Sequence, residues 1–296
     1  MNQDHPLLKD LTPAQCEAVT HIDGPLLVLA GAGSGKTRVI TRRVAYLLDQ
    51  GIHPSSILAI TFTNKAAGEM RQRIQKLKPD TSVWISTFHS LGARLLRQYA
   101  ERLDLDRNFT IYDQTDRKRL TKMAMEDVGL DSGKVTPEAV QAGISKAKNQ
   151  LLSPRRFAQR AHGFVNETIA LVYPAYEKRL RDANARDFDD VLYWTDLAMK
   201  NDDGLREEHD SRFRYILIDE YQDTNQAQYA LSKGLSHTYQ NICIVGDPDQ
   251  CLPPETEIET PEGRKRIEDL KEGGRVISGA GGNKALLHKN EKVTVN

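Results

Sequence analysis

The stretch LLVLAGAGSGKT, residues 26–37, decides the fold. Its first five residues are apolar and predict a short buried strand, and the glycine-rich run that follows leads into a helical pattern. Glycines at such a junction let backbone N–H groups converge on an anion, and the helix N-terminus adds positive potential. The stretch therefore predicts a phosphate-binding loop rather than an ordinary glycine-rich turn.

The positions of this loop have separate expected roles. Lys36 would reach the β- and γ-phosphates of a nucleotide, and the hydroxyl of Thr37 would bind Mg²⁺. Ala30 stands where such loops usually have their first glycine, which we interpret as a minor variation. The residues predicted to bind the nucleotide phosphates are Ala30, Gly31, Ala32, Gly33, Ser34, Gly35, Lys36, Thr37 and Arg38.

Further apolar runs alternate with helical patterns along the chain. Strands are predicted at residues 57–62, 82–87, 215–219 and 241–246, and helices at residues 37–50 and 65–78. This alternation is typical of a parallel sheet covered on both faces. After FTIYD, the segment 110–195 instead predicts helices, at residues 116–129, 137–150 and 166–183. We therefore expect an α/β fold with an inserted all-helical subdomain.

Composition limits the class of protein. The 296 residues are 39% hydrophobic and 28% charged, which fits a soluble chain with one large or two smaller domains. No run of about 18 apolar residues predicts a membrane span, and the N-terminus does not resemble a secretory signal. Three cysteines are too few for a disulfide framework and favour a reducing compartment. We expect a cytoplasmic protein.

Charge is unevenly distributed although the formal net charge is zero. Residues 65–160 carry 19 Lys and Arg against 11 Asp and Glu, whereas residues 182–250 carry 6 against 15. Solvated helical faces would explain this pattern. A basic surface for a polyanion beside an acidic metal–phosphate centre would explain it equally well.

Two further stretches place polar residues where apolar strands end. In LIDEYQDTN, residues 217–225, Asp219 and Glu220 would lie at the edge of the sheet where ligands bind. One carboxylate there can hold Mg²⁺ and the next can accept a proton from an attacking water. An isolated acid pair is usually surface charge, but a complete phosphate loop favours a catalytic pair. In IVGDPDQ, residues 244–250, Gln250 would sense the γ-phosphate.

Seven stretches, in this order, resemble the UvrD/Rep/PcrA-like superfamily 1 DNA helicases: LTPAQ (11–15), AGAGSGKT (30–37), AITFTNKAAGEM (59–70), STFHS (86–90), DFDDVL (187–192), LIDEYQDTN (217–225) and IVGDPDQ (244–250). ITFTNKAA and LIDEYQDTN are specific to this family. Other phosphate-loop enzymes share only the loop and the acid pair. The resemblance covers residues 1–250.

The resemblance implies roles for individual residues. Gln15 would read the adenine edge, Glu220 would be the general base, and Gln250 would couple hydrolysis to DNA movement. The residues implied to contact single-stranded DNA are Phe62, Thr63, Asn64, Thr87, Phe88 and His89. An aromatic ring to stack on a base and small polar groups for phosphates suit that task. We assign no chemistry to DFDD, residues 187–190, beyond an acidic helix start.

The family implies an ATP- and Mg²⁺-dependent 3′–5′ helicase that acts on single-stranded DNA and on junctions of single- and double-stranded DNA. Residues 1–109 and 196–250 would form its first RecA-like lobe, with residues 110–195 as a helical accessory subdomain. We expect this N-terminal portion to be inactive in unwinding. An ATP- and DNA-binding module without productive turnover is the alternative. A phosphate-loop kinase is a third possibility, against which ITFTNKAA counts.

The chain changes character at Cys251. Where the family continues Gln-Ser-Ile-Tyr, this chain has CLPPETEIETPEGRKRIEDLKEGGRVIS, residues 251–278, which resembles the start of an intein. The resemblance implies that the sulfur of Cys251 attacks the Gln250 carbonyl and turns the amide into a thioester. The closing blocks of an intein are not found in residues 251–296, so we expect an N-terminal intein fragment: either the sequence is truncated, or it is the N-terminal half of a split intein that needs a C-terminal half. A divergent helicase insertion with an incidental cysteine is the alternative.

Overall fold

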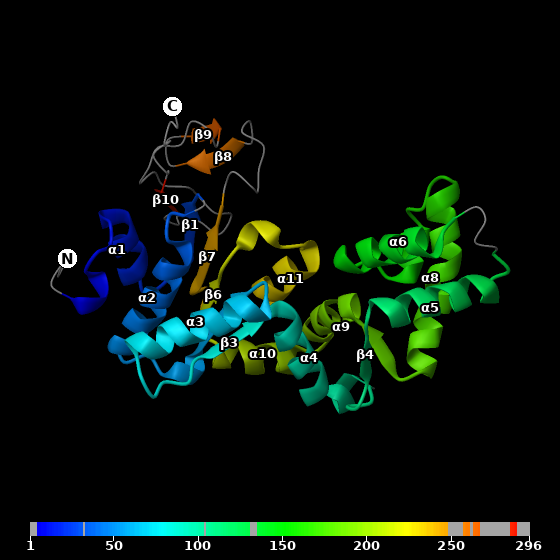
Figure 1. Cartoon of the computed structure of the whole chain (residues 1–296), viewed down its shortest axis with the longest axis horizontal. Helices are drawn as coiled ribbons and strands as arrows, with labels where there is room; N and C mark the ends of the chain where they lie inside the picture. The colour runs from blue at the N-terminus through cyan, green and yellow to red at the C-terminus, as the bar shows by residue number, and fades with distance from the viewer. Residues whose placement is uncertain are drawn as a thin grey trace. The chain divides into compact units, whose positions relative to one another are not determined.

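The computed structural model describes two compact units, drawn in Figure 1. The first comprises residues 1–87, 206–224 and 235–296, and the second comprises residues 88–205 and 225–234. The described residues are 5–31, 33–103, 105–130 and 135–247, with the strands at 257–260, 263–266 and 285–288.

The first unit contains a six-stranded sheet in the order β10-β1-β7-β6-β2-β3, and every neighbouring pair is parallel. The strands are β1 (Leu26–Ala30), β2 (Ile57–Thr61), β3 (Trp84–Thr87), β6 (Tyr215–Ile218), β7 (Ile242–Gly246) and β10 (Ala285–His288). The predicted parallel α/β sheet is confirmed. All five residues of β2 are buried, as in a strand covered on both faces.

Three helices of this unit pack one on the next beside the sheet (Figure 1). They are α1 (Pro13–Thr20), α2 (Lys36–Asp49) and α3 (Asn64–Leu77), with α1 on α2 and α2 on α3. Helix α2 ends before Gly51, which has a φ of 81° as expected of a glycine that terminates a helix. Short 3₁₀ turns complete the unit: η1 (Pro6–Leu8), η2 (Pro54–Ser56) and η4 (Tyr221–Asp223).

The apolar faces of these helices and strands form one core. Val28, Ile40, Ala59 and Leu217 are each at most 5% exposed and belong to the same cluster. Burial of this apolar surface fixes β1 against α2 and thereby positions the loop that joins them.

The second unit is mainly helical. Its elements are α4 (Phe88–Gln98), η3 (Ala100–Leu103), β4 (Thr110–Tyr112), α5 (Gln114–Asp127), α6 (Pro137–Asn149), α7 (Pro154–Ala158), α8 (Phe164–Asp182), β5 (Ala185–Asp187), α9 (Phe188–Asn201) and α11 (Gln226–Leu235), while α10 (Asp203–Arg212) crosses the division. The expectation of an all-helical subdomain was wrong, because β4 and β5 pair in parallel. This unit is also larger than residues 110–195, because α4 packs on α9.

A buried cluster of charged side chains lies at the start of α9, around its helix cap. Asp187 caps α9 in a reciprocal pair of hydrogen bonds with Asp190, and both carboxylates are fully buried. Lys148 of α6 lies 2.8 Å from Asp187, 2.7 Å from Asp190 and 2.7 Å from Glu177 of α8. Burial alone would lower the pKa of Lys148, but these three acids together raise it, so the ammonium stays charged.

Beyond residue 247 the structure describes three strands. β8 (Glu257–Thr260) and β9 (Gly263–Arg266) pair antiparallel, which confirms the strand predicted through TEIET. Gln250 and Cys251 lie outside the described residues. Within the part of the chain that is described, no helix has the length and apolar character to cross a bilayer.

Candidate nucleotide site

The phosphate loop connects β1 to α2, as the sequence predicts. Gly33 and Gly35 have φ values of 76° and 88°, a left-handed conformation that is strained for other residues. A Cβ at Gly35 would also lie 3.3 Å from Nε2 of Gln15. Both glycines are therefore required by the backbone path of the loop. Ala32 lies outside the described residues.

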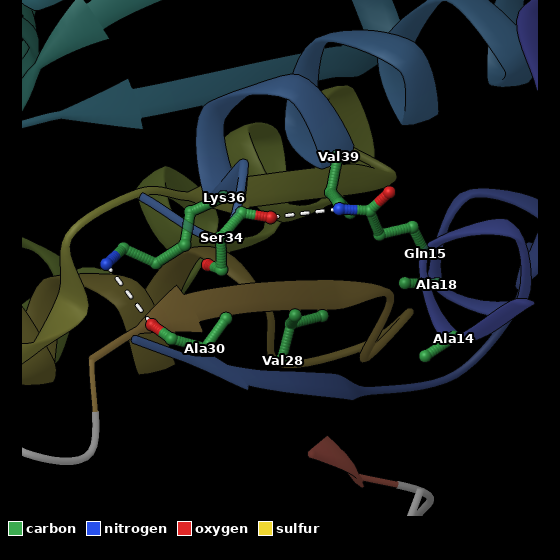
Figure 2. A pocket seen from close by; sticks show the side chains of 8 residues that line it. All are labelled: Ala14, Gln15, Ala18, Val28, Ala30, Ser34, Lys36 and Val39. Carbon is green, nitrogen blue, oxygen red and sulfur yellow. Dashed lines mark hydrogen bonds between the residues drawn. The ribbon is translucent and has the colours of Figure 1, made fainter. Parts of the chain in front are cut away.

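Lys36 is the first residue of α2 and is only 9% exposed. Its ammonium donates to the carbonyl oxygens of Ala30 at 3.2 Å and Gly31 at 3.4 Å; Figure 2 shows the first of these bonds. It also lies 3.5 Å from Oδ2 of Asp247 and 4.0 Å from Oε2 of Glu220. A buried cation with these partners can bind phosphate oxygens by exchanging the carbonyls for them.

Thr37 and Asp219 supply oxygen ligands suited to Mg²⁺. The Thr37 hydroxyl donates to Oδ2 of Asp219 at 3.1 Å, although the two residues are 182 positions apart. Burial, together with the charge of Glu220, raises the pKa of Asp219 to about 6. The charged form of this buried carboxylate is unfavourable unless a cation lies beside it. Together with the Thr37 hydroxyl, it offers the oxygen ligands that a hard divalent cation prefers.

Glu220 directly follows this carboxylate and is turned toward the solvent. Its backbone has a left-handed φ of 53°, unusual for a glutamate, and its side chain is 38% exposed. Nε2 of Gln222 donates to its carboxylate at 2.6 Å. Neighbouring carboxylates of such different exposure can divide the metal-binding and proton-accepting tasks between them.

Gln15 lies against the loop through its side-chain amide. Its Nε2 donates to the Ser34 carbonyl at 2.9 Å (Figure 2), and its Oε1 accepts the Thr12 backbone N–H at 3.0 Å. The cavity between Gln15 and the start of α2 measures about 10 Å³, room for about one water molecule. To read an adenine edge, the amide would exchange the Ser34 carbonyl for the base.

A cleft of about 630 Å³ opens over these groups. It is lined by Gly33, Gly35, Lys36, Thr37, Arg38, Thr61, Phe62, Thr63, Ala66, Arg73, Glu220, Gln222 and Asp223. The sequence did not single out Arg73, Gln222 or Asp223. Arg73 is one of several basic residues on α3, and helical spacing alone does not distinguish those that face a cleft. Gln222 and Asp223 lie inside LIDEYQDTN, so motif context was the signal for them.

The segment after β2 fits the role inferred for it in part. Phe62 is half-buried and lines the cleft, while Thr63 and Asn64 are exposed. Thr63 also caps α3, because its hydroxyl accepts the Ala66 backbone N–H at 3.1 Å. The capping bond thus orients the Thr63 side chain, and Thr63 and Asn64 are both accessible to solvent.

The segment after β3 differs from the expectation. Phe88 is 1% exposed, so stacking of its ring on a base is wrong for this structure, and Thr87 is also buried. The accessible ring is Phe188, which is 50% exposed and stacks on His89 with centroids 3.6 Å apart and planes at 17°. Burial lowers the pKa of His89 to about 4, so the imidazole is neutral at pH 7. The sequence did not predict this contact, because His89 and Phe188 are 99 positions apart.

These features define a class of protein. A glycine-rich loop between a strand and a helix of a parallel sheet, with a lysine and two strand-end carboxylates around it, is a nucleotide site of the P-loop type. Residues 11–252 match the sequence profile of the UvrD/REP helicase N-terminal domain, and the chain belongs to that family.

Curated relatives agree with this assignment. The ATP-dependent DNA helicase PcrA of Staphylococcus aureus is 45% identical over 249 residues, and PcrA of Staphylococcus epidermidis is 44% identical over 249 residues. Each alignment covers 83% of this chain and 34% of the relative. The chain therefore spans about a third of the length of the relatives that it matches.

Proposed function

We propose that this chain is the N-terminal part of an ATP-dependent 3′–5′ DNA helicase that binds and hydrolyses ATP and binds single-stranded DNA and its junctions with duplex. The observation that carries the proposal is that Lys36, Thr37 and Glu220 line one cleft, with the buried carboxylate of Asp219 hydrogen-bonded to Thr37 behind it. The names of the PcrA relatives support the DNA substrate and the use of ATP. The polarity rests on family resemblance. The low cysteine content supports a cytoplasmic location.

The residues divide the work of hydrolysis. Lys36 leaves the Ala30 and Gly31 carbonyls and neutralises the β- and γ-phosphate oxygens. Thr37 and Asp219 would hold Mg²⁺, which supplies positive charge to the phosphates when it is bound. Glu220 orients the attacking water and accepts its proton, because it is the accessible carboxylate of the pair. Gln250, beyond the described residues, would sense the γ-phosphate.

Calorimetry of Mg-ATP binding tests this assignment. Lys36→Ala should weaken binding at least about tenfold, because a charge-assisted contact to phosphate is lost. Glu220→Gln should bind like wild type and lose hydrolysis, because only the proton acceptor is removed. Equal affinity of wild type and Lys36→Ala would refute the site. Binding without DNA-stimulated turnover in wild type would favour the alternative of a binding module.

A second proposal concerns residues 251–296 and rests on sequence resemblance and on the β8–β9 hairpin. We propose that Cys251 starts an intein fragment. The thiolate attacks the Gln250 carbonyl, the C–N bond breaks as the C–S bond forms, and the released Cys251 amine takes up a proton. A C-terminal intein half, on the same chain or on a separate one, would finish splicing.

Mass spectrometry tests the intein proposal. Added thiol should cleave slowly after Gln250, and Cys251→Ala should abolish this cleavage. A matching C-terminal half should release residues 251–296 and join Gln250 to a serine. An intact chain in wild type and variant alike, with every half supplied, would identify an ordinary insertion.

A further inference from the structure

Gln222 bridges two parts of the nucleotide site with its side-chain amide. Nε2 donates to Oε2 of Glu220 at 2.6 Å, and Oε1 accepts the backbone N–H of Asp247 at 2.9 Å. These partners also fix which end of the amide is which. A backbone N–H can only donate, so it must face the oxygen, and an ionised carboxylate can only accept, so it must face the nitrogen.

The backbone at the end of β7 is packed against this bridge. A Cβ at Gly246 would lie 3.4 Å from Oε1 of Gln222 and 3.5 Å from its backbone nitrogen. These are ordinary van der Waals distances, so the end of β7 and Gln222 lie in direct contact where Asp247 donates to Gln222. The contact between η4 and the end of β7 therefore combines this packing with the hydrogen bond from Asp247.

The far end of the bridge also reaches the phosphate loop. Asp247 is 2% exposed, and its Oδ2 lies 3.5 Å from the ammonium of Lys36. Lys36 lies 4.0 Å from Glu220, beyond hydrogen-bond distance, so the short contact on the Glu220 carboxylate comes from Gln222. Glu220 is 38% exposed, and without Gln222 only the longer contact with Lys36 would restrict its side chain.

We propose that Gln222 is a positioning residue for ATP hydrolysis: it holds the carboxylate of Glu220 toward the cleft and ties its orientation to the start of the 247–250 loop. The inference rests on the proposed function, because it assigns Glu220 as the general base. When Lys36 moves to the phosphates, it leaves Asp247. Because Gln222 is hydrogen-bonded to both Asp247 and Glu220, a shift of Asp247 then alters the orientation of the Glu220 carboxylate.

Steady-state ATP hydrolysis by the full chain, with single-stranded DNA present, tests this role. Gln222→Ala should lower kcat about tenfold, which is a part of the rate enhancement that a general base supplies. It should leave KM for ATP within about twofold of wild type. Gln222→Glu keeps an acceptor for the Asp247 N–H but loses the donor to Glu220, so it should lower kcat as strongly. Gln228→Ala is the matched control, because Oε1 of this buried glutamine also accepts a backbone N–H, from Asn225 at 3.0 Å. It should leave kcat unchanged.

A double variant separates positioning from a merely structural role. If Gln222 acts through Glu220, adding Gln222→Ala to Glu220→Gln should cause no further loss of kcat, whereas independent effects would multiply. If Glu220→Gln abolishes ATP hydrolysis but Gln222→Ala keeps the wild-type kcat, the role of Gln222 is overturned and the proposed function is not. Wild-type kcat in Glu220→Gln would overturn the proposed function itself.

A measurement without turnover covers the case in which the chain hydrolyses ATP too slowly to assay. Hydrogen exchange of the Asp247 amide should accelerate at least about threefold in Glu220→Ala, because Gln222 loses the partner that fixes its rotamer. Unchanged exchange of this amide in Glu220→Ala would show that Gln222 does not couple the two groups.

Discussion

Asp219 is a buried carboxyl whose pKa burial raises to about 6 from an ordinary value of 3.8. Because its folded pKa is the higher one, its protonated form stabilises the fold below about pH 4, and that contribution is lost as the pH rises through about 6. Above this pH the carboxylate is charged and suited to Mg²⁺.

Mg-ATP affinity should therefore fall as the pH is lowered from 7.5 to about 5.5, more steeply in wild type than in Asp219→Asn. Asp219→Asn should also melt at a higher temperature than wild type at pH 7.5 without nucleotide, since it removes a buried charge. Titration calorimetry and thermal melting check the two parts. Parallel pH dependence in both proteins would exclude Asp219 as the titrating ligand.

Phe88 and Phe188 make a matched pair of aromatic residues. Phe88→Ala should cost about 3–5 kcal/mol of stability, because its ring is in the core. Phe188→Ala should leave stability nearly unchanged and weaken single-stranded DNA binding by about 1–3 kcal/mol, because an exposed ring is lost. Urea unfolding and fluorescence anisotropy measure these effects. Unaltered DNA affinity in Phe188→Ala would show that this ring does not stack on a base.

Lys148 is a buried cation of α6 that pairs with Glu177 of α8 and with Asp187 and Asp190 at the start of α9. Lys148→Met should destabilise the protein by about 3–5 kcal/mol, because the buried Asp190 would lose the ammonium and Asp187 would keep only Arg117, 3.9 Å away, as a counter-charge. Adding Asp190→Asn should restore part of that loss. Urea unfolding measures both variants. A loss below about 1 kcal/mol in Lys148→Met would show that water replaces the ammonium.

Over the whole chain, the uneven charge should govern binding to DNA. Affinity for single-stranded DNA should fall linearly with the logarithm of salt concentration, with a slope of about −0.7 for each phosphate neutralised. Lys65 and Lys76 on α3 are exposed, and replacing both with Gln should make the slope shallower. Anisotropy titrations at several salt concentrations provide the slope. Affinity independent of salt would rule out a phosphate-binding surface.

The two compact units should respond separately to nucleotide. At 100 times its dissociation constant, Mg-ATP should stabilise the unit that binds it by about 2.7 kcal/mol. Hydrogen exchange should therefore slow around the phosphate loop and β6, and less within α5, α6 and α8. Uniform slowing across both units would contradict a nucleotide site built from the first unit alone.

The sequence by itself determined the α/β class, the positions of the five motif-bearing strands and the phosphate loop. These features depend on short-range physics: apolar runs form buried strands, and glycines permit left-handed turns within a few residues of Lys36. The motifs likewise indicated Asp219 and Glu220, because strand ends in a parallel sheet meet at one edge.

The tertiary structure alone decided which of these side chains are buried and which are paired. Phe88 and Phe188 have the same side chain, yet long-range packing puts one ring in the core and the other in solvent. The strands β4 and β5 are three residues each, too short for a periodic pattern, and they exist because they pair across 72 intervening residues. The contacts of Gln222 with Asp247 and of Lys148 with Asp187 arise in the same way. Burial and charge pairing depend on residues distant in sequence, and these appear only when the chain has folded.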